Sequence, residues 1–273
     1  MVAPPLPFTV EPLTLRTRDA VRLDAVQLTA VESAGGPGIV VAHGFTGSWR
    51  QPPVRRVASL LSRYGTVLAF DFRGHGRSGG RSTVGDREIW DVEAAVARLR
   101  ASGHERVATV GFSMGASVVV RHAGLVGGVA GAVSVSGPSR WYYRGTAPMR
   151  RVHWAIERPL GRVVARYALR TRIARGPWDP VPVSPVEAAG MITPAPFLVV
   201  QGDADPYFPV EHGRRLYAAA REPRELWIEP GYGHAESAAS GELLHRIGRW
   251  VAGHAEGTPT VAKAQADLHD GMT

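Results

Sequence analysis

The most informative segment of the sequence is Val107-Ala-Thr-Val-Gly111-Phe-Ser113-Met-Gly115-Ala116-Ser-Val-Val-Val120. Its β-branched run before Gly111 predicts a buried strand, and the residues after Ser113 predict a helix. A serine in the sharp turn between them takes strained backbone angles, so its neighbours must be very small, as Gly111, Gly115 and Ala116 are. The following helix points its N-terminal amides at any negative charge that develops beside the hydroxyl. We therefore interpret Ser113 as a nucleophile, although the Gly-x-Ser-x-Gly pentapeptide by itself also fits an ordinary Gly-Ser turn.

A serine hydroxyl is a weak nucleophile at neutral pH and needs a histidine base that is held by a carboxylate. Two later segments place such groups just beyond predicted strands. The first reads Gly202-Asp203-Ala204-Asp205-Pro206, and the second contains Gly233-His234. We predict that His234 is the general base and that one of the two aspartates orients it. The chain order Ser, Asp, His differs from the orders found in chymotrypsin-like and subtilisin-like enzymes.

The sequence around these segments alternates between strand and helix patterns. Residues 13–23 and 24–30 predict an opening antiparallel hairpin, and residues 38–42 predict a buried strand. Further strands are predicted at 66–70, 106–111, 130–136, 196–200 and 225–228, and helices at 54–63, 86–101, 114–123, 210–220 and 241–255. Such alternation is typical of a mostly parallel sheet with helices on both faces and ligand sites beyond the strands' carboxyl ends.

One stretch breaks this alternation. Residues 137–190 are punctuated by proline and rich in arginine and tryptophan, and they exceed an ordinary connection of roughly 2–6 residues. We predict that they form a cap over the site. The chain then divides into an α/β core, residues 1–136 and 191–255, the inserted cap, and a flexible C-terminal tail, residues 256–273, which is small, polar and aperiodic.

Several short motifs occur in an order that is typical of one family. They are His43-Gly44-Phe45, Asp71-Phe-Arg73-Gly74-His75-Gly76-Arg77-Ser78, the segment around Ser113, Gly202-x-x-Asp205 and Gly233-His234. Together they resemble the α/β-hydrolase family over nearly all of the first 255 residues. The resemblance implies an α/β fold with a mostly parallel, doubly wound sheet of the α/β-hydrolase type and a cap inserted after the sixth strand. It also implies that Asp205 rather than Asp203 completes the triad, and that the backbone amides of Phe45 and Met114 form the oxyanion hole.

The composition excludes several other classes of protein. The chain has 273 residues and 44% hydrophobic content, enough for a substantial core, and it has no cysteine, which excludes disulfides, thiolate zinc sites and a cysteine nucleophile. Its net charge of +8 includes one lysine, Lys263, so we attribute the charge to arginine usage and expect no nucleic-acid partner. Without a signal-like N-terminus or a long apolar run, we expect a soluble, cytoplasmic protein with no integral membrane association. No His-x-x-x-His pair or carboxylate cluster indicates a metal, and no cofactor is expected.

The predicted cap concentrates the positive charge, with ten arginines in residues 137–190 against three acidic residues. After Pro159 the helical pattern has a basic face and an apolar face. These faces consist of Arg162, Arg166 and Arg170 and of Leu160, Val163, Val164 and Tyr167, respectively. We expect a solvated basic face above an apolar underside that roofs the pocket. The alternatives are recognition of an anionic substrate such as acyl-CoA, of an acidic partner, or of an anionic membrane surface.

These residues together predict an enzyme that hydrolyses carboxylic esters through an acyl-enzyme. A thioesterase acting on acyl-CoA or carrier-bound acyl groups is the alternative, and a non-catalytic scaffold of the same fold is a third interpretation. The candidate substrate pocket is lined by aromatic side chains, which in a cap are as often simply its own small core. These are Trp141, Tyr142, Trp154, Tyr207 and Phe208.

Overall fold

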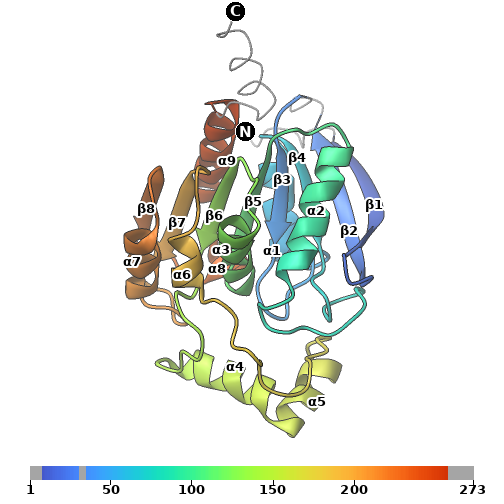
Figure 1. Ribbon diagram of the computed structural model, residues 1–273, viewed down its shortest axis with the longest axis vertical. Helices are drawn as coiled ribbons and strands as arrows, with labels where there is room; N and C mark the ends of the chain where they lie inside the picture. The colour runs from blue at the N-terminus through green and yellow to red at the C-terminus, as the bar shows by residue number, and fades with distance from the viewer. Residues whose placement is uncertain (1–7, 31–34, 258–273) are drawn as a thin grey trace, which may run out of the picture.

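An eight-stranded sheet forms the middle layer of the protein (Figure 1), which the computed structural model describes over residues 8–30 and 35–257. The strands are β1 (Phe8–Arg16), β2 (Arg22–Ala30), β3 (Gly38–Ala42), β4 (Thr66–Phe70), β5 (Val107–Phe112), β6 (Gly131–Val135), β7 (Phe197–Gly202) and β8 (Arg224–Glu229). Their order across the sheet is β1-β2-β4-β3-β5-β6-β7-β8. Only the β1–β2 and β2–β4 pairs are antiparallel. The predicted mostly parallel sheet is therefore confirmed.

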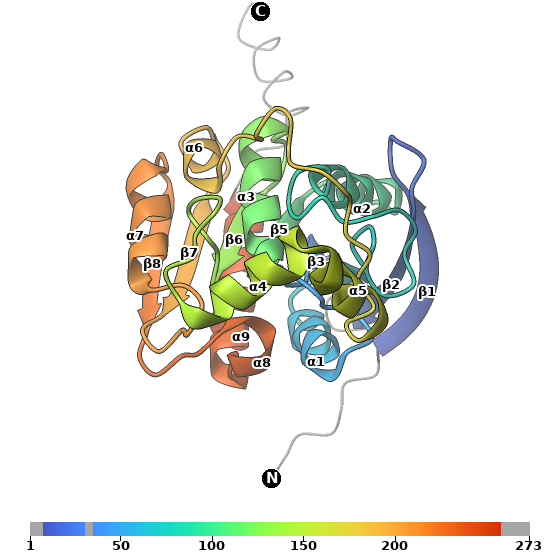
Figure 2. The ribbon, with the colours of Figure 1, turned by 90° about the horizontal axis from the view of Figure 1, so that it is seen from below.

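Helices cover both faces of the sheet (Figure 2). One face carries α2 (Ile89–Ala101), α3 (Met114–Leu125), α6 (Pro185–Ala189) and α7 (Val210–Ala219), and the other carries α1 (Pro52–Leu61), α8 (Ala235–Ala238) and α9 (Gly241–Gly257). The central strand β3 is buried along its whole length. Val40 packs with the first group of helices, whereas Ile39 and Val41 pack with the second. This two-sided burial explains why β3 has a continuous apolar sequence instead of an alternating one.

The opening hairpin turns earlier than the sequence pattern predicts. β1 ends at Arg16, and the turn is closed by a hydrogen bond of 2.9 Å from the Val21 N–H to the Thr17 hydroxyl. Ala20 in this turn has a φ of 64°. The prediction of a strand over residues 13–23 was wrong because polar and apolar residues continue to alternate through the turn. The remaining predicted strands and helices of the core differ from the observed ones by a few residues at their ends.

Two helices of the predicted cap lie beyond one end of the sheet. They are α4 (Ala147–Glu157) and α5 (Pro159–Tyr167), below the sheet in Figure 1 and in front of the ends of β3 and β5 in Figure 2. The chain then returns to the core at α6, where Ala188 and Ala189 are fully buried in the same apolar cluster as α3. The chain therefore packs on the core again before residue 190, the predicted end of the cap, and the sequence pattern does not show that so short a helix does so.

The apolar face of α5 is not the buried underside that the sequence pattern predicts. Leu160 and Tyr167 are 65% and 74% exposed, and Val163 is 51% exposed. The buried residues of α5 are instead Gly161 and Ala165. The periodicity identifies the apolar face correctly but does not show whether another element covers it.

The last core helix, α9, extends to Gly257, so the predicted flexible tail begins within a helix. The rest of that predicted tail, residues 258–273, lies outside the described residues. Among the helices that the structure describes, none has the length and apolar character that a membrane crossing requires.

Candidate active site

Ser113 occupies the turn between β5 and α3. Its φ of 51° and ψ of −113° are strained for a residue that carries a side chain. The turn is very tight, because a Cβ on Gly111 would lie 2.3 Å from the Gly115 carbonyl oxygen, and a Cβ on Gly115 would lie 2.2 Å from that of Ala42. The Ser113 N–H donates a hydrogen bond of 2.9 Å to the Val135 carbonyl at the end of β6. The two glycines and this bond hold the partly exposed serine at the carboxyl end of the sheet.

Three side chains from separate loops form a continuous chain of hydrogen bonds. The Ser113 hydroxyl lies 3.0 Å from Nε2 of His234, and Nδ1 of His234 lies 2.8 Å from Oδ2 of Asp205. The Asp205 side chain is fully buried, and that of His234 is 16% exposed. Because a carboxylate accepts hydrogen bonds, Nδ1 carries the imidazole proton and Nε2 has a free lone pair facing the hydroxyl. This arrangement allows His234 to remove the proton of Ser113.

The loop after β7 separates the two candidate acids. Asp205 also accepts hydrogen bonds from the backbone N–H groups of Tyr207 and Phe208, at 2.8 and 3.1 Å. Asp203 is exposed and accepts a hydrogen bond from a backbone N–H in the β8–α8 loop. The structure therefore brings Asp205, and not Asp203, to His234.

The loop after β3 lies against the serine. A Cβ on Gly44 would be 3.2 Å from Cβ of Ser113. Within residues 8–30 and 35–257, neither the Phe45 N–H nor the Met114 N–H donates a hydrogen bond. Met114 is the first residue of α3, where the N–H groups have no partner within the helix. Neither amide therefore has a hydrogen-bond acceptor among the described residues.

Glu236, a residue that no sequence motif indicated, holds this loop. Its carboxylate is almost buried and accepts a hydrogen bond of 2.6 Å from the Gly44 N–H. From the other side, Nδ1 of His43 lies 2.7 Å from the Gly44 carbonyl, while Nε2 of His43 accepts a hydrogen bond from the Phe72 N–H at 3.1 Å. Gly44, which precedes Phe45, is thus held at its N–H by Glu236 and at its carbonyl by His43. The available sequence signal was the position of Glu236 two residues after His234.

The segment from Asp71 to Ser78 builds a supporting loop. The Asp71 carboxylate accepts hydrogen bonds from the N–H groups of Trp49, at 2.8 Å, and Arg77, at 3.0 Å. Gly76, with a φ of 46°, is required here because a Cβ would lie 2.0 Å from the same carboxylate. His75 is buried, which lowers its pKa to about 3, so it remains neutral. These contacts give His43 and His75 partners within the loops after β3 and β4.

A protein-family model described as the alpha/beta hydrolase family matches residues 39–242. The chain belongs to this family. It is 27% identical over 260 residues to a monoacylglycerol lipase of Mycolicibacterium smegmatis, and the aligned region covers 79% of this chain and 88% of the lipase. It is 28% identical over 237 residues to an uncharacterized protein of Mycobacterium tuberculosis, and the aligned region covers 81% of this chain and 71% of that protein. An esterase from Pyrococcus furiosus superposes with a TM-score of 0.69 at 27% identity and covers 89% of this chain and 90% of the esterase.

Two of the predicted pocket aromatics in this hydrolase contact His234. The Tyr207 ring stacks on the imidazole with centroids 4.1 Å apart, and the Phe208 ring lies 5.7 Å away. Phe208 also contacts His212, which accepts a hydrogen bond of 3.0 Å from the Ser139 N–H. Burial lowers the pKa of His212 to about 4. His212 is buried although α7 is a surface helix, because the segment that leads into the cap covers this face of α7.

The other three predicted pocket aromatics contact different groups. Trp141 and Tyr142 pack on Trp178, with centroids 5.1 and 5.6 Å apart, and the Trp141 indole N–H donates to the carbonyl of Pro182. Trp154 on α4 is 43% exposed. Trp141 and Tyr142 thus form a cluster within the cap segment, and the assignment of these three residues to the substrate pocket stays a prediction.

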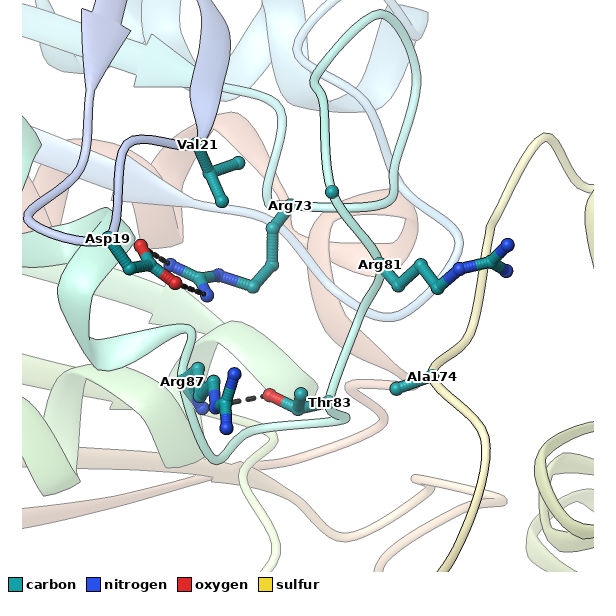
Figure 3. Close-up of a pocket in the computed structure, with 8 residues that line it drawn as sticks. Asp19, Val21, Arg73, Arg81, Thr83, Arg87 and Ala174 are labelled. Atoms are coloured by element: carbon teal, nitrogen blue, oxygen red, sulfur yellow. Dashed lines mark hydrogen bonds and ion pairs between the residues drawn. The ribbon is translucent and has the colours of Figure 1, made fainter.

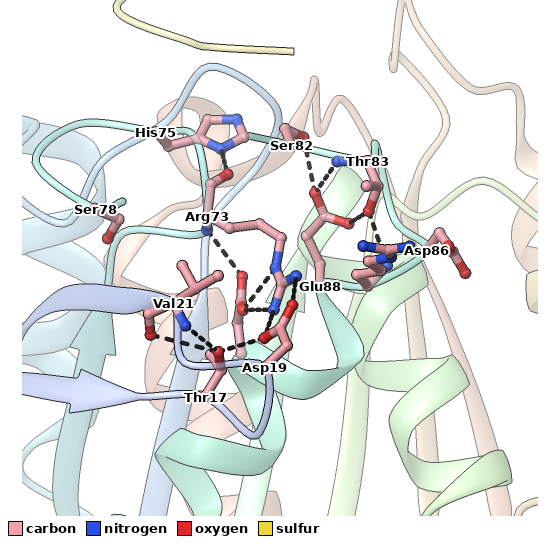
Figure 4. Close-up of polar contacts among 12 residues, drawn as sticks. Thr17, Asp19, Val21, Arg73, His75, Ser78, Ser82, Thr83, Asp86 and Glu88 are labelled. Atoms are coloured by element: carbon pink, nitrogen blue, oxygen red, sulfur yellow. Dashed lines mark hydrogen bonds and ion pairs between the residues drawn. The ribbon is translucent and has the colours of Figure 1, made fainter. Parts of the chain in front are cut away.

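A cavity of about 410 Å³ lies beside the β1–β2 turn (Figure 3), and none of Ser113, Asp205 and His234 lines it. Its buried guanidinium, from Arg73, pairs with Asp19 at 2.8 Å (Figure 4) and also with Asp91 at 2.8 Å. Burial lowers the pKa of Arg73, but the hydrogen bonds from both carboxylates outweigh this and raise it above its usual value. The network ties the hairpin turn to α2 and has a structural role.

In the part of the chain that the structure describes, no group of three His, Asp or Glu side chains is placed to hold a metal.

Proposed function

We propose that this hydrolase cleaves carboxylic esters through an acyl-enzyme on Ser113, with His234 as general base and Asp205 as the acid that orients it. The observation that carries the proposal is the hydrogen-bonded chain from the Ser113 hydroxyl through His234, at 3.0 Å, to Asp205, at 2.8 Å. The names of two relatives, an esterase and a monoacylglycerol lipase, support an ester as the class of substrate.

In the acylation step the Ser113 oxygen attacks the ester carbonyl while its proton moves to Nε2 of His234. The carbonyl oxygen becomes an oxyanion, and we assign the N–H groups of Phe45 and Met114 as its donors. Each such donor stabilises the transition state by about 3–4 kcal/mol. The C–O bond of the ester then breaks, and the alcohol leaves with the proton from His234. The acyl group remains on Ser113.

In the deacylation step water replaces the alcohol. His234 takes a proton from the water, the resulting hydroxide attacks the acyl-enzyme, and a second oxyanion forms against the same two amides. Collapse of this intermediate returns the proton to Ser113 and releases a carboxylic acid. The chain between β6 and α6, which includes α4 and α5, is proposed as the cap over this chemistry.

A thioesterase is the second candidate, because the same three residues cleave thioesters. It is favoured by the charge of the cap, where residues 140–175 contain ten arginines and one acidic residue, Glu157. Acyl-CoA and acidic acyl carriers both present phosphate or carboxylate groups that arginine binds.

A substrate panel distinguishes the two candidates and tests the nucleophile. p-Nitrophenyl esters and acyl-CoAs are assayed with the wild-type protein and with Ser113→Ala, beside labelling by a fluorophosphonate. We expect ester hydrolysis to exceed acyl-CoA hydrolysis, and Ser113→Ala to abolish labelling and reduce kcat by up to about 10⁶. If the folded variant retains more than a tenth of the wild-type activity, Ser113 is not the nucleophile. Faster turnover of acyl-CoA favours the thioesterase.

A further inference from the structure

Helix α5 presents its large apolar side chains to the outside of the protein. In an amphipathic helix of a globular protein such side chains normally face the core. Here Leu160, Val163 and Tyr167 are 65%, 51% and 74% exposed, and Val164 and Leu169 beside them are 39% and 43% exposed. No other element within residues 8–30 and 35–257 covers them.

The way α5 contacts α4 explains this exposure. A Cβ on Gly161 would lie 2.3 Å from the Trp154 carbonyl oxygen and 2.7 Å from Cα of Ala155, so the two backbones touch. Ala165, one turn further along α5, is fully buried. Because the helix packs through its smallest residues, its larger apolar side chains point elsewhere. Figure 2 shows both helices on the outer side of the cap, in front of the end of the sheet that carries the serine turn.

Arginines lie next to this apolar face. Arg162 and Arg166 lie one turn apart on α5, Arg158 is the N-cap residue of the helix, and Arg170 follows three residues after its end. Arg158, Arg166 and Arg170 are exposed. The one acidic residue among residues 140–175 is Glu157, and it is already bonded to Arg144 and His153 at 2.5 and 2.8 Å. The apolar face of α5 is therefore bordered by positive charge that no neighbouring carboxylate of the cap neutralises.

This combination of charge and apolar surface discriminates between possible partners. If two copies of the chain paired through α5, the arginines on and beside the two helices would approach each other, and like charges would oppose the contact. The surface of an anionic bilayer matches both parts of the helix, since apolar side chains enter the boundary of the acyl chains while guanidinium groups bind lipid phosphates. Arginine side chains extend along the apolar surface and keep their charge in the headgroup layer.

We propose that α5 docks this protein on the surface of anionic lipid bilayers. Docking through α5 turns the end of the sheet that carries Ser113 toward the lipid, so an ester substrate could enter from the bilayer (Figure 2). The proposal does not depend on the chemistry assigned to Ser113, because lipid binding is measured without turnover.

Sedimentation with lipid vesicles tests the proposal on the full-length protein. Vesicles of phosphatidylcholine mixed with phosphatidylglycerol are compared with vesicles of phosphatidylcholine alone. We expect the wild-type protein to bind the anionic vesicles at least about tenfold more tightly, and the difference to shrink as added salt shortens the Debye length. Equal binding to both kinds of vesicle, or no binding to either, overturns the proposal.

Two triple variants separate the contributions of charge and apolar area. Each arginine near an anionic surface changes partitioning by about fivefold, so Arg158→Gln, Arg166→Gln and Arg170→Gln together should weaken binding by at least about tenfold. Arg162 is retained because it donates to carbonyls at the end of α4. Replacing Leu160, Val163 and Tyr167 by serine removes the inserted area and should weaken binding by a similar factor. Binding of either variant at the wild-type level overturns the proposal.

Control substitutions lie outside the cap. Arg63→Gln with Arg249→Gln removes exposed charge just after α1 and in the middle of α9, and Leu125→Ser with Val126→Ser removes exposed apolar area at the end of α3. Both double variants should bind anionic vesicles like the wild type, and loss of binding in either overturns the assignment to α5. Hydrolysis of a soluble ester by the α5 variants should remain at the wild-type level. A dimer in solution that dissociates in the apolar variant, without vesicle binding by the wild type, would assign this face to a second copy instead.

Discussion

Replacing Asp205 by asparagine tests how His234 is oriented, and the surrounding contacts determine how the new amide lies. Oδ1 of Asp205 accepts two backbone N–H groups, from Tyr207 at 2.8 Å and Phe208 at 3.1 Å. An NH₂ group at that position would face two donors, so the amide oxygen takes the place of Oδ1. The NH₂ group then takes the place of Oδ2, 2.8 Å from Nδ1 of His234.

This orientation favours the wrong histidine tautomer. With an NH₂ donor beside it, Nδ1 of His234 must accept a hydrogen bond, so the imidazole proton moves to Nε2. Nε2 faces the Ser113 hydroxyl, and once protonated it can no longer take the proton of that hydroxyl. A contact of 3.0 Å between Nδ1 and Oδ1 remains and keeps some of the productive tautomer. We therefore expect kcat to fall by about 10³ to 10⁴, equivalent to about 4–5.5 kcal/mol of transition-state stabilisation.

The assay is steady-state hydrolysis of a p-nitrophenyl ester, with thermal unfolding to show that the variants fold. Asp203→Asn is the matched control, because Asp203 is exposed and accepts a hydrogen bond from one backbone N–H through one oxygen. The side-chain oxygen of an asparagine can accept the same hydrogen bond. We expect the control to retain activity within about twofold of the wild type. Comparable losses in the two variants, or a larger loss in Asp203→Asn at an unchanged melting temperature, would refute the assignment of Asp205.

Two further predictions follow from buried side chains. Glu236→Ala leaves the Gly44 N–H without an acceptor and should lower kcat by about tenfold with little change in KM. Glu236→Gln keeps an acceptor for this N–H and should retain most of the activity. Equal kinetics of the two variants would contradict a role of Glu236 in positioning this loop. Burial lowers the pKa of His122 to about 4 in the folded protein. At pH 5 the unfolded state, in which His122 has an ordinary pKa, therefore binds more protons than the folded state. The free energy of unfolding consequently decreases as the pH falls from 7 to 5. His122→Leu should reduce this loss between pH 7 and pH 5 by roughly 2 kcal/mol in urea unfolding, and an unchanged loss would show that His122 is protonated in the folded state.

The strands of the core were predictable because their sequences respond to one strong constraint, burial on both faces. The segment at 38–42 and that at 66–70 match β3 and β4 residue for residue. The hairpin turn, α6 and α8 were not predicted correctly, because short elements are defined by contacts with the rest of the fold and carry little periodicity of their own. His212 on α7 illustrates the same point, since its side chain is buried only because a distant segment of the chain folds over it.

The sequence by itself determined the type of each functional group and its order along the chain, because a strained turn tolerates few residues and the ends of parallel strands meet at one edge of the sheet. The tertiary structure alone decided that Glu236 orients the loop beside Ser113 and that the apolar face of α5 remains exposed. The physical reason is that a local pattern records what a residue can do within its own strand or helix. The distance between loops and the packing partner of a helix face depend on residues far away in the chain, whose positions exist only in the folded protein.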